Sequence, residues 1–220
     1  MSTVLVTGAT GTVGSVANAI DAAARAGVQR LVKLSALGAE PGSPLAFWDA
    51  HGRIEGLLER AGIPAVVLRP TFYMSNLLAS AEAVRSTRRL FLPAGDAKVA
   101  MIDPRDVAAA AAAALMGAGE GGRRFHLTGP EAVTFSSVAD ELSDAVGYPV
   151  ELVDVPDDAA RAAMVEAGMP EWAAANLVTL FGFLRQGAQA STTEDFGRLT
   201  GRQPRTVGQF ARDHAQLFAR

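Results

Sequence analysis

The sequence predicts an α/β fold built on a mostly parallel, doubly wound sheet. Short apolar runs alternate with amphipathic helical segments through the first part of the chain, as they do in βαβ units. A glycine-rich turn directly follows the first apolar run and opens the first helix, which is typical of a Rossmann-like sheet. After Gly129 helices dominate the pattern. We therefore expect a Rossmann-like core over residues 1–130 and a small helical lobe over residues 131–220 that is not independent.

The individual elements follow from apolar periodicity and from the residues that interrupt it. Strands are expected at residues 4–6, 30–34, 64–68, 99–102, 124–127 and 150–153. Helices are expected at residues 12–26, 47–61, 73–84, 104–116, 135–146, 157–167, 171–186 and 207–218. The strand at 64–68 is the most apolar of the set, so we place it in the centre of the sheet. Gly27 and Gly62 end the first two helices.

Composition excludes several classes of protein. The 220 residues are 49% hydrophobic and 20% charged, which is the balance of a globular domain rather than of a disordered tail. The chain has no cysteine and three histidines far apart in sequence, so we expect neither a disulfide nor a metal site. A net charge of −3 makes nucleic acid a poor partner. The apolar runs are too short to span a membrane or to form a signal peptide, so we expect a cytoplasmic protein.

The glycine-rich turn is the first segment that carries chemistry. Its residues are Gly8, Ala9, Thr10, Gly11, Thr12, Val13 and Gly14. Glycines at these positions permit a tight turn and a close approach of the backbone to a pyrophosphate, and the following helix offers free N–H groups. The segment therefore predicts dinucleotide binding. The alternative is a turn that packs a strand against a helix and binds nothing.

Several blocks of the sequence resemble the NmrA-like branch of the atypical short-chain dehydrogenases/reductases. The blocks are residues 7–14, 23–36, 47–76 and 192–218. The resemblance implies an NAD(P)H-dependent reductase fold, with NADP or NAD as the cofactor. In that family roughly 60 further residues separate the glycine turn from the block at 23–36, about two βα units and a strand. The missing stretch would carry the residues that contact the ribose and adenine.

The shortened core leaves two positions for the strand at Arg30–Leu34. A right-handed crossover can place it in the empty slot of the family's second strand, where Ser35 would lie near a ribose. Otherwise it lies on the other side of the first strand, where Ser35 is nearer the family's catalytic position. The sequence does not decide between these arrangements.

The helix at 47–61 occupies the place of the family's catalytic Tyr-x-x-x-Lys helix. Phe47 falls on the tyrosine position, which excludes the usual tyrosine proton donor. His51 falls on the lysine position and is a candidate for ribose binding or for donation to a substrate oxygen, with Glu55 one turn further on to orient it. Ser35 is the second catalytic candidate, as a donor to a substrate carbonyl. The alternatives are an exposed helix histidine and a hydroxyl that satisfies a strand end.

Ligands of open α/β sheets bind beyond the carboxyl ends of the strands. The resemblance implies that the nicotinamide meets the backbone after the third strand, at Pro70, Thr71 and Phe72. We expect the substrate to face Trp48, Tyr73 and Asn76, which otherwise serve in packing.

Together these observations predict an NAD(P)H-dependent oxidoreductase that passes hydride to a quinone-like or conjugated carbonyl acceptor. The partner is then a small molecule, and a homodimer would cover the edge of a shortened sheet. Two alternatives remain. Loss of the tyrosine favours a non-catalytic NAD(P)-sensing or protein-binding module, and loss of the adenosine contacts favours a scaffold without cofactor binding.

Overall fold

The protein divides into two compact units. The structure, a computed structural model, describes residues 3–7, 13–119 and 123–219, with side chains from residue 13 onward. The first unit comprises residues 1–71, 105–128 and 193–204, and the second comprises residues 72–104, 129–192 and 205–220. The units are thus interleaved along the chain, whereas the sequence prediction placed one boundary at residue 130. Each unit is considered by itself below.

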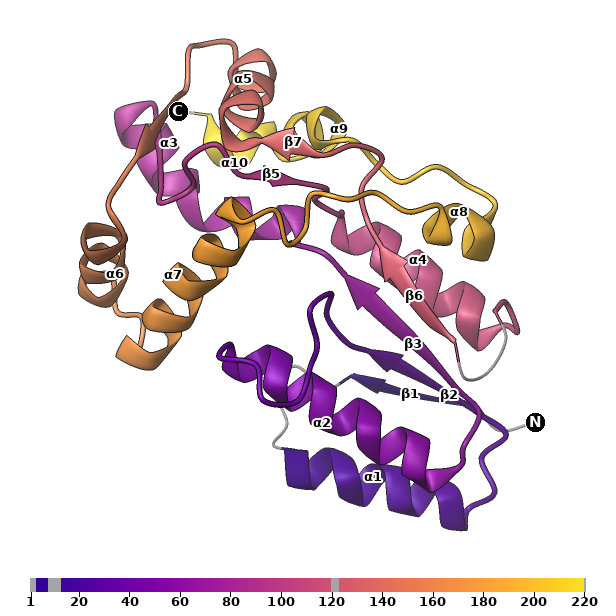
Figure 1. The fold of residues 1–220 in the computed structure, drawn as a ribbon. Coiled ribbons are helices and arrows are strands. Elements are labelled where there is room, and N and C mark those ends of the chain that lie inside the picture. Colours follow the sequence, from indigo (N-terminus) through magenta and orange to yellow (C-terminus); the bar gives the residue numbers. More distant parts are fainter. Residues whose placement is uncertain (1–2, 8–12, 120–122, 220) are drawn as a thin grey trace. The chain divides into compact units, whose positions relative to one another are not determined.

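A four-stranded parallel sheet forms the centre of the first unit (Figure 1). In sheet order its strands are β1 (Thr3–Thr7), β2 (Arg30–Leu34), β3 (Ala65–Pro70) and β6 (Arg124–Leu127). The expected central position of the third strand is confirmed, because β3 pairs with β2 on one side and with β6 on the other. β2 lies between β1 and β3, which is the second of the two arrangements left open by the sequence.

Helices cover both faces of this sheet. Those of the first unit are α1 (Val13–Arg25), α2 (Ala46–Ala61), α4 (Pro104–Leu115, in this unit from Arg105) and α8 (Asp195–Thr200). α1 and α2 lie side by side on one face, and α4 lies on the other (Figure 1). The predicted α/β class with a parallel sheet is therefore confirmed.

The side chains between α2 and the sheet change from apolar to polar along the strands. Near the amino ends, α1 and α2 enclose an apolar cluster of Val16, Ile20, Ala23, Leu31, Ile54, Leu58 and Ala65. Side chains alternate between the two faces of a strand, so Leu31 and Lys33 of β2, and Ser35 directly after it, all face α2. The last two are polar and buried. The interface between sheet and helix is thus apolar at one end and polar at the carboxyl ends of β2 and β3.

The second unit combines short strands with helices. β4 (Arg89–Leu92) pairs in parallel with β8 (Glu151–Asp154), and β5 (Lys98–Val99) pairs antiparallel with β7 (Val133–Thr134). Its helices are η1 (Met74–Ser80), α3 (Ala81–Thr87), α5 (Phe135–Val146), α6 (Asp157–Glu166), α7 (Glu171–Arg185), α9 (Val207–Asp213) and α10 (Ala215–Phe218). Phe72, Phe135 and Phe181 form its aromatic core, with ring centroids 5.6–6.1 Å apart.

Several local predictions were wrong. The strand expected at 99–102 is β5, which ends at Val99, and neither β7 nor α8 was predicted. The helix expected at 73–84 is a 3₁₀ segment followed by α3. The helix expected at 207–218 is interrupted at His214, and the strand β4 was not predicted. These short elements depend on tertiary pairing, which single-sequence periodicity does not detect.

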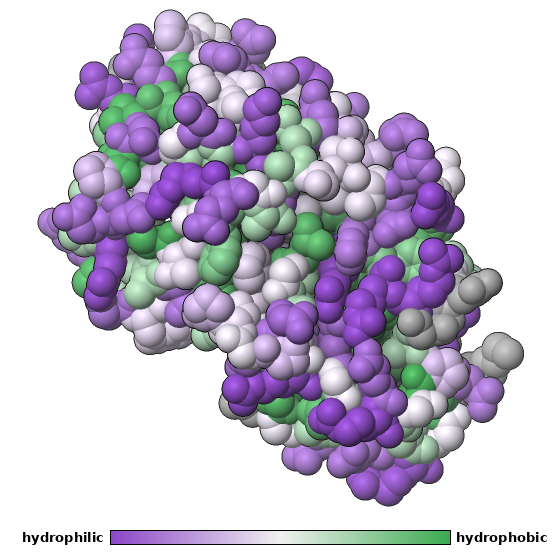
Figure 2. Space-filling view, in the orientation of Figure 1, coloured by the Kyte–Doolittle hydropathy of each residue, from purple (hydrophilic) through white to green (hydrophobic). Residues whose placement is uncertain are grey.

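The described residues contain no helix long and apolar enough to cross a membrane, and no group of three or more potential ligands that would hold a metal ion. On the face drawn in Figure 2, hydrophilic and hydrophobic side chains are interspersed. β1 forms one edge of the described sheet, with β2 as its partner. The homodimer expected to cover this edge stays a prediction.

Candidate functional site

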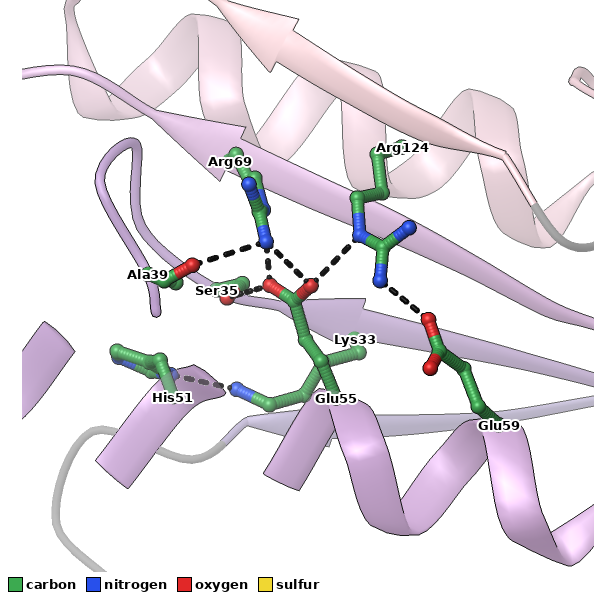
Figure 3. Close-up of polar contacts among 8 residues, drawn as sticks. All are labelled: Lys33, Ser35, Ala39, His51, Glu55, Glu59, Arg69 and Arg124. Carbon is green, nitrogen blue, oxygen red and sulfur yellow. Dashed lines mark hydrogen bonds and ion pairs between the residues drawn. The ribbon is translucent and has the colours of Figure 1, made fainter. Parts of the chain in front are cut away.

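A cluster of buried charged and polar side chains lies between α2 and the sheet (Figure 3). α2 faces the sheet through residues at helical spacing, among them His51, Glu55 and Leu58. Gly52 lets this helix approach the preceding loop, since a Cβ there would lie 2.5 Å from backbone atoms of Glu40 and Pro41. The close approach holds the polar part of α2 over the carboxyl ends of β2 and β3.

Glu55 is the centre of the cluster. The residue is 2% exposed, and its carboxylate accepts four hydrogen bonds. Oε1 accepts from Ser35 Oγ at 2.5 Å and from Arg69 Nε at 2.9 Å. Oε2 accepts from Arg69 Nη2 at 2.7 Å and from Arg124 Nε at 2.8 Å. These contacts tie α2 to β2, β3 and β6 through one carboxylate.

The net electrostatic effect on Glu55 favours its charged form. Burial by itself raises the pKa of this carboxyl, but the hydrogen bonds from Arg69, Arg124 and Ser35 outweigh it and hold the pKa below its usual value. Arg124 also contacts Glu59, and Arg69 Nη2 donates to the carbonyl of Ala39 at 3.0 Å. The carboxylate of Glu55 is therefore ionised at neutral pH.

Lys33 and His51 form a second buried contact in the same cluster. Lys33 Nζ lies 2.9 Å from His51 Nδ1 and also donates to the carbonyl oxygen of Leu34. Lys33 is fully buried and His51 is 8% exposed. Burial disfavours the charged form of each group, and two positive charges this close together would also repel each other.

Burial is the largest cause of the lowered pKa at both Lys33 and His51. Burial lowers the pKa of Lys33 to about 8, although the charge of Glu55 acts in the opposite direction. Burial and the positive charge of Lys33 lower the pKa of His51 to about 4, again against the effect of Glu55. At neutral pH the pair is thus an ammonium and a neutral imidazole.

The structure changes the interpretation of the two catalytic candidates. His51 is buried rather than exposed, and its partner is Lys33 instead of Glu55, because Glu55 turns to the two arginines. The hydroxyl of Ser35 donates its single hydrogen to Glu55 rather than to the local backbone. While that bond lasts, Ser35 has only acceptor capacity to offer a ligand.

Lys33, Arg69 and Arg124 were not among the candidate site residues predicted from the sequence. The signal was present in the strands themselves. Lys33 and Arg69 each interrupt an otherwise apolar run, RLVKL and AVVLRP. A charge in such a strand is buried and must find a partner across the interface.

The glycine-rich segment is only partly described. Gly8, Ala9, Thr10, Gly11 and Thr12 lie outside the described residues. Val13 and Gly14 form the beginning of α1, as expected. The prediction of pyrophosphate binding by this segment stays a prediction.

In the first unit, Pro70 and Thr71 follow β3 with part of their backbone already in use. The carbonyl of Pro70 accepts from Leu37 N at 2.8 Å, and Thr71 N donates to the carbonyl of Leu127 at 3.0 Å. A carbonyl oxygen has two lone pairs, so that of Pro70 can accept a second hydrogen bond. The role expected for these residues thus requires the ligand to donate.

In the second unit, Phe72 N donates to Gln189 Oε1 at 2.7 Å, and the Phe72 ring belongs to the aromatic core. Tyr73 is half-buried, and burial raises the pKa of its phenol to about 12, so it stays protonated at physiological pH. Asn76 is exposed on η1. Their expected places beside the nicotinamide and the substrate stay predictions.

Trp48 and Phe47 differ in exposure. Trp48 is 5% exposed, and its ring lies so close to Gly38 that a Cβ there would meet it at 2.6 Å. Phe47 is 38% exposed and meets Trp48 edge to face, with the ring centroids 5.8 Å apart. A substrate wall at Trp48 stays a prediction, and the described contacts of its ring are packing contacts.

A parallel sheet with helices on both faces and polar side chains at the carboxyl ends of adjacent strands is typical of Rossmann-like proteins. The chain belongs to the NmrA-like family, whose model matches residues 17–210. This confirms the resemblance noted in the sequence.

Relatives include enzymes named as reductases. The chain is 35% identical over 199 residues to an NAD(P)H azoreductase of Xenophilus azovorans, covering 90% of this chain and 70% of the relative. It is 39% identical over 199 residues, with the same coverage, to a (4-alkanoyl-5-oxo-2,5-dihydrofuran-3-yl)methyl phosphate reductase of Streptomyces griseus. Among solved structures, the NADPH complex of a quinone oxidoreductase from Escherichia coli matches with a TM-score of 0.87 and 29% identity, covering 95% of this chain and 75% of that one.

Proposed function

We propose that this chain is an NAD(P)H-dependent oxidoreductase that passes hydride to a quinone-like or conjugated carbonyl acceptor. The observation that carries the proposal is the polar cluster at the carboxyl ends of β2 and β3. Over most of its length the chain is similar to reductases, one of which is named an NAD(P)H azoreductase. Ligands of open parallel sheets bind at such strand ends.

The donors and acceptors of the described residues fit a nicotinamide ribose and its carboxamide. Neutral His51 donates through its ring N–H, and the oxygens of Ser35 and Pro70 accept from hydroxyl or amide hydrogens. The carboxylate of Glu55 fixes Ser35 so that its lone pairs are held in one direction. The glycine-rich segment around Gly11 would hold the pyrophosphate.

When bound, NAD(P)H supplies the hydride, and the protein supplies position and electrostatics. The acceptor gains this hydride and one proton to form a hydroquinone or a saturated carbonyl product. His51 is neutral above a pH of about 4, so it does not deliver that proton as an imidazolium. It holds an oxygen by hydrogen bonding, and water provides the proton.

Calorimetric titration with NADPH and then NADH, in a buffer low in phosphate, tests cofactor binding. We expect a Kd in the micromolar range and loss of binding in Gly11→Asp, because a carboxylate would repel the pyrophosphate. Asn18→Asp is the matched control: it adds the same charge at an exposed position of α1 and should leave the Kd within roughly two-fold. Absence of binding at millimolar NADPH and NADH would contradict the proposal and favour a scaffold.

Turnover separates an enzyme from a sensor. NADPH oxidation is followed with 1,4-naphthoquinone and, separately, with an α,β-unsaturated ketone. Oxidation that is saturable in the acceptor supports the reductase. Micromolar NADPH binding with no acceptor-dependent oxidation would instead favour the non-catalytic module, for which Phe47 at the position of the usual tyrosine is the relevant observation.

A further inference from the structure

Lys33 lies in the middle of the first unit with no exposed surface, although it extends from a strand flanked by apolar neighbours. Its Nζ has two recorded partners, the carbonyl oxygen of Leu34 and His51 Nδ1. Replacing a buried charged pair by well-packed apolar side chains is often neutral or stabilising, so burial of this ammonium is weak evidence for a role in stability. The presence of a buried lysine at residue 33 therefore needs an explanation other than stability.

The chemistry of the two partners determines where the imidazole proton lies. An ammonium has three donors and no acceptor, so His51 Nδ1 must accept in this contact. A neutral imidazole that accepts at Nδ1 carries its hydrogen at Nε2. In Figure 3 the ring edge opposite Lys33 points away from the Glu55 cluster.

We propose that Lys33 is a positioning residue that locks His51 in the Nε2–H tautomer, so that the ring is a permanent neutral donor toward a bound oxygen acceptor. Among the described residues, no hydrogen bond is recorded for Nε2, so the donor is available to a ligand. The tautomer follows from the contact alone. Its use on a ribose hydroxyl or an acceptor oxygen rests on the proposed function.

The charged groups around the ring agree with this assignment. Lys33 faces it from β2, while Glu55 lies one turn further along α2 and is neutralised by Arg69 of β3 and Arg124 of β6. Burial and the charge of Lys33 hold the pKa of His51 near 4, and Lys33 itself stays charged up to a pKa of about 8. Between these values the ring has one charge state and one tautomer.

Nitrogen-15 NMR of the imidazole rings in the cofactor-free protein tests the tautomer directly. The chain has three histidines, so His51→Gln assigns the His51 signals. His214 provides an internal reference of the opposite kind, because its Nδ1 lies 2.9 Å from the carbonyl oxygen of Phe210, which can only accept. We expect Nε2–H at His51 and Nδ1–H at His214, at pH 6 to 7. Nδ1–H at His51 would overturn the proposal.

Lys33→Met tests the cause, since methionine keeps the length of the side chain and removes the donor. We expect the His51 pKa to rise and the Nε2–H tautomer to lose its exclusive population, while Lys98→Met, at the exposed second lysine of the chain, changes neither. Unchanged His51 signals in Lys33→Met would overturn the proposal. If this variant fails to fold, a pH titration of the unaltered protein replaces it: the His51 signals should shift as Lys33 deprotonates near pH 8, and constancy there would refute the coupling.

NADPH titration separates this inference from the proposed function. Loss of the oriented donor in Lys33→Met should weaken NADPH binding by roughly ten-fold. If the tautomer is as expected but the unaltered protein does not bind NADPH, the proposed function fails and the assignment of the tautomer stands. If NADPH binds equally well to Lys33→Met despite a changed tautomer, the role of the donor in cofactor binding is refuted.

Discussion

Glu55→Gln should be among the most destabilising single substitutions in the first unit. The carboxylate accepts four hydrogen bonds at 2.5–2.9 Å, three of them from guanidinium groups. Glutamine keeps the shape but places an amide donor opposite arginine donors, and it removes the negative charge. Breaking a buried ion pair by removing one partner costs about 3–5 kcal/mol.

The structure places the expected loss at the lower end of that range. The side chain of Arg69 is 16% exposed and that of Arg124 is 41% exposed, so water partly solvates both guanidinium groups after the change. We therefore expect a loss of about 3 kcal/mol in the free energy of unfolding at pH 7, or a fall in Tm of about 6–12 °C for a chain of this size. The assay is urea and thermal unfolding followed by circular dichroism.

Glu59→Gln is the matched control on the same helix. The side chain of Glu59 is 63% exposed and contacts only the outer edge of Arg124, so its removal should cost less than about 1 kcal/mol. The low pKa of Glu55 adds a pH signature: its contribution is present above the usual glutamate pKa and is lost as acid protonates the native carboxylate. A Glu55→Gln protein within about 1 kcal/mol of the unaltered protein at pH 7 would refute this account of the cluster.

Three further predictions follow from the same structure. Gly52→Ala should destabilise by about 1–3 kcal/mol because its Cβ would meet the Pro41 backbone nitrogen at 2.5 Å. Gly56→Ala, one turn later, should stabilise by about 0.5–1 kcal/mol because its Cβ would only touch the flexible Arg60 side chain, at 3.4 Å from Nη1; equal Tm values for the two variants would contradict this. The pKa of Lys33 is lowered from 10.5 to about 8, so between these pH values the unfolded chain binds more protons than the folded protein. The free energy of unfolding, measured with urea, should therefore rise with pH across this range by up to about 3 kcal/mol in the unaltered protein. Lys33→Met should not show this rise. Thr206→Ala should cost about 1 kcal/mol in thermal unfolding by removing the capping box of α9, and Thr206→Ser should retain most of it.

Much of the first unit could be predicted from the sequence because its local signals agree with its fold. The strand at Arg30–Leu34 has the predicted bounds, and α2 begins one residue earlier than expected and ends at Ala61 before Gly62 in the left-handed conformation. Apolar periodicity and a glycine that ends a helix are both local signals, so they can be recognised in the sequence without knowledge of the tertiary contacts. The order of β1 and β2 is not local, and only the structure decided it.

The candidate site could be predicted only in part. Residue type and position selected Ser35 and His51, but their partners come from other elements of the fold. Glu55 meets Arg124, which is 69 residues away in the chain, and no sequence spacing indicates that contact. The expected His51–Glu55 pair failed because two arginines compete for the same carboxylate more strongly than a neutral imidazole does.

The division of the α2 interface into an apolar and a polar end bears on why the cluster exists. At the amino ends of the strands, Leu31 packs against Ile54 and Leu58, and burial of such side chains is a direct source of stability. At the carboxyl ends, the interface holds Lys33 of β2 and Glu55 of α2, whose burial gains little net free energy even when both are paired. A fold under selection for stability alone would continue the apolar packing to this end of the strands. The polar end is the one at which parallel sheets bind their ligands. The stability is therefore lost at the place where the fixed donor of His51 and the fixed acceptor of Ser35 can bind a ligand.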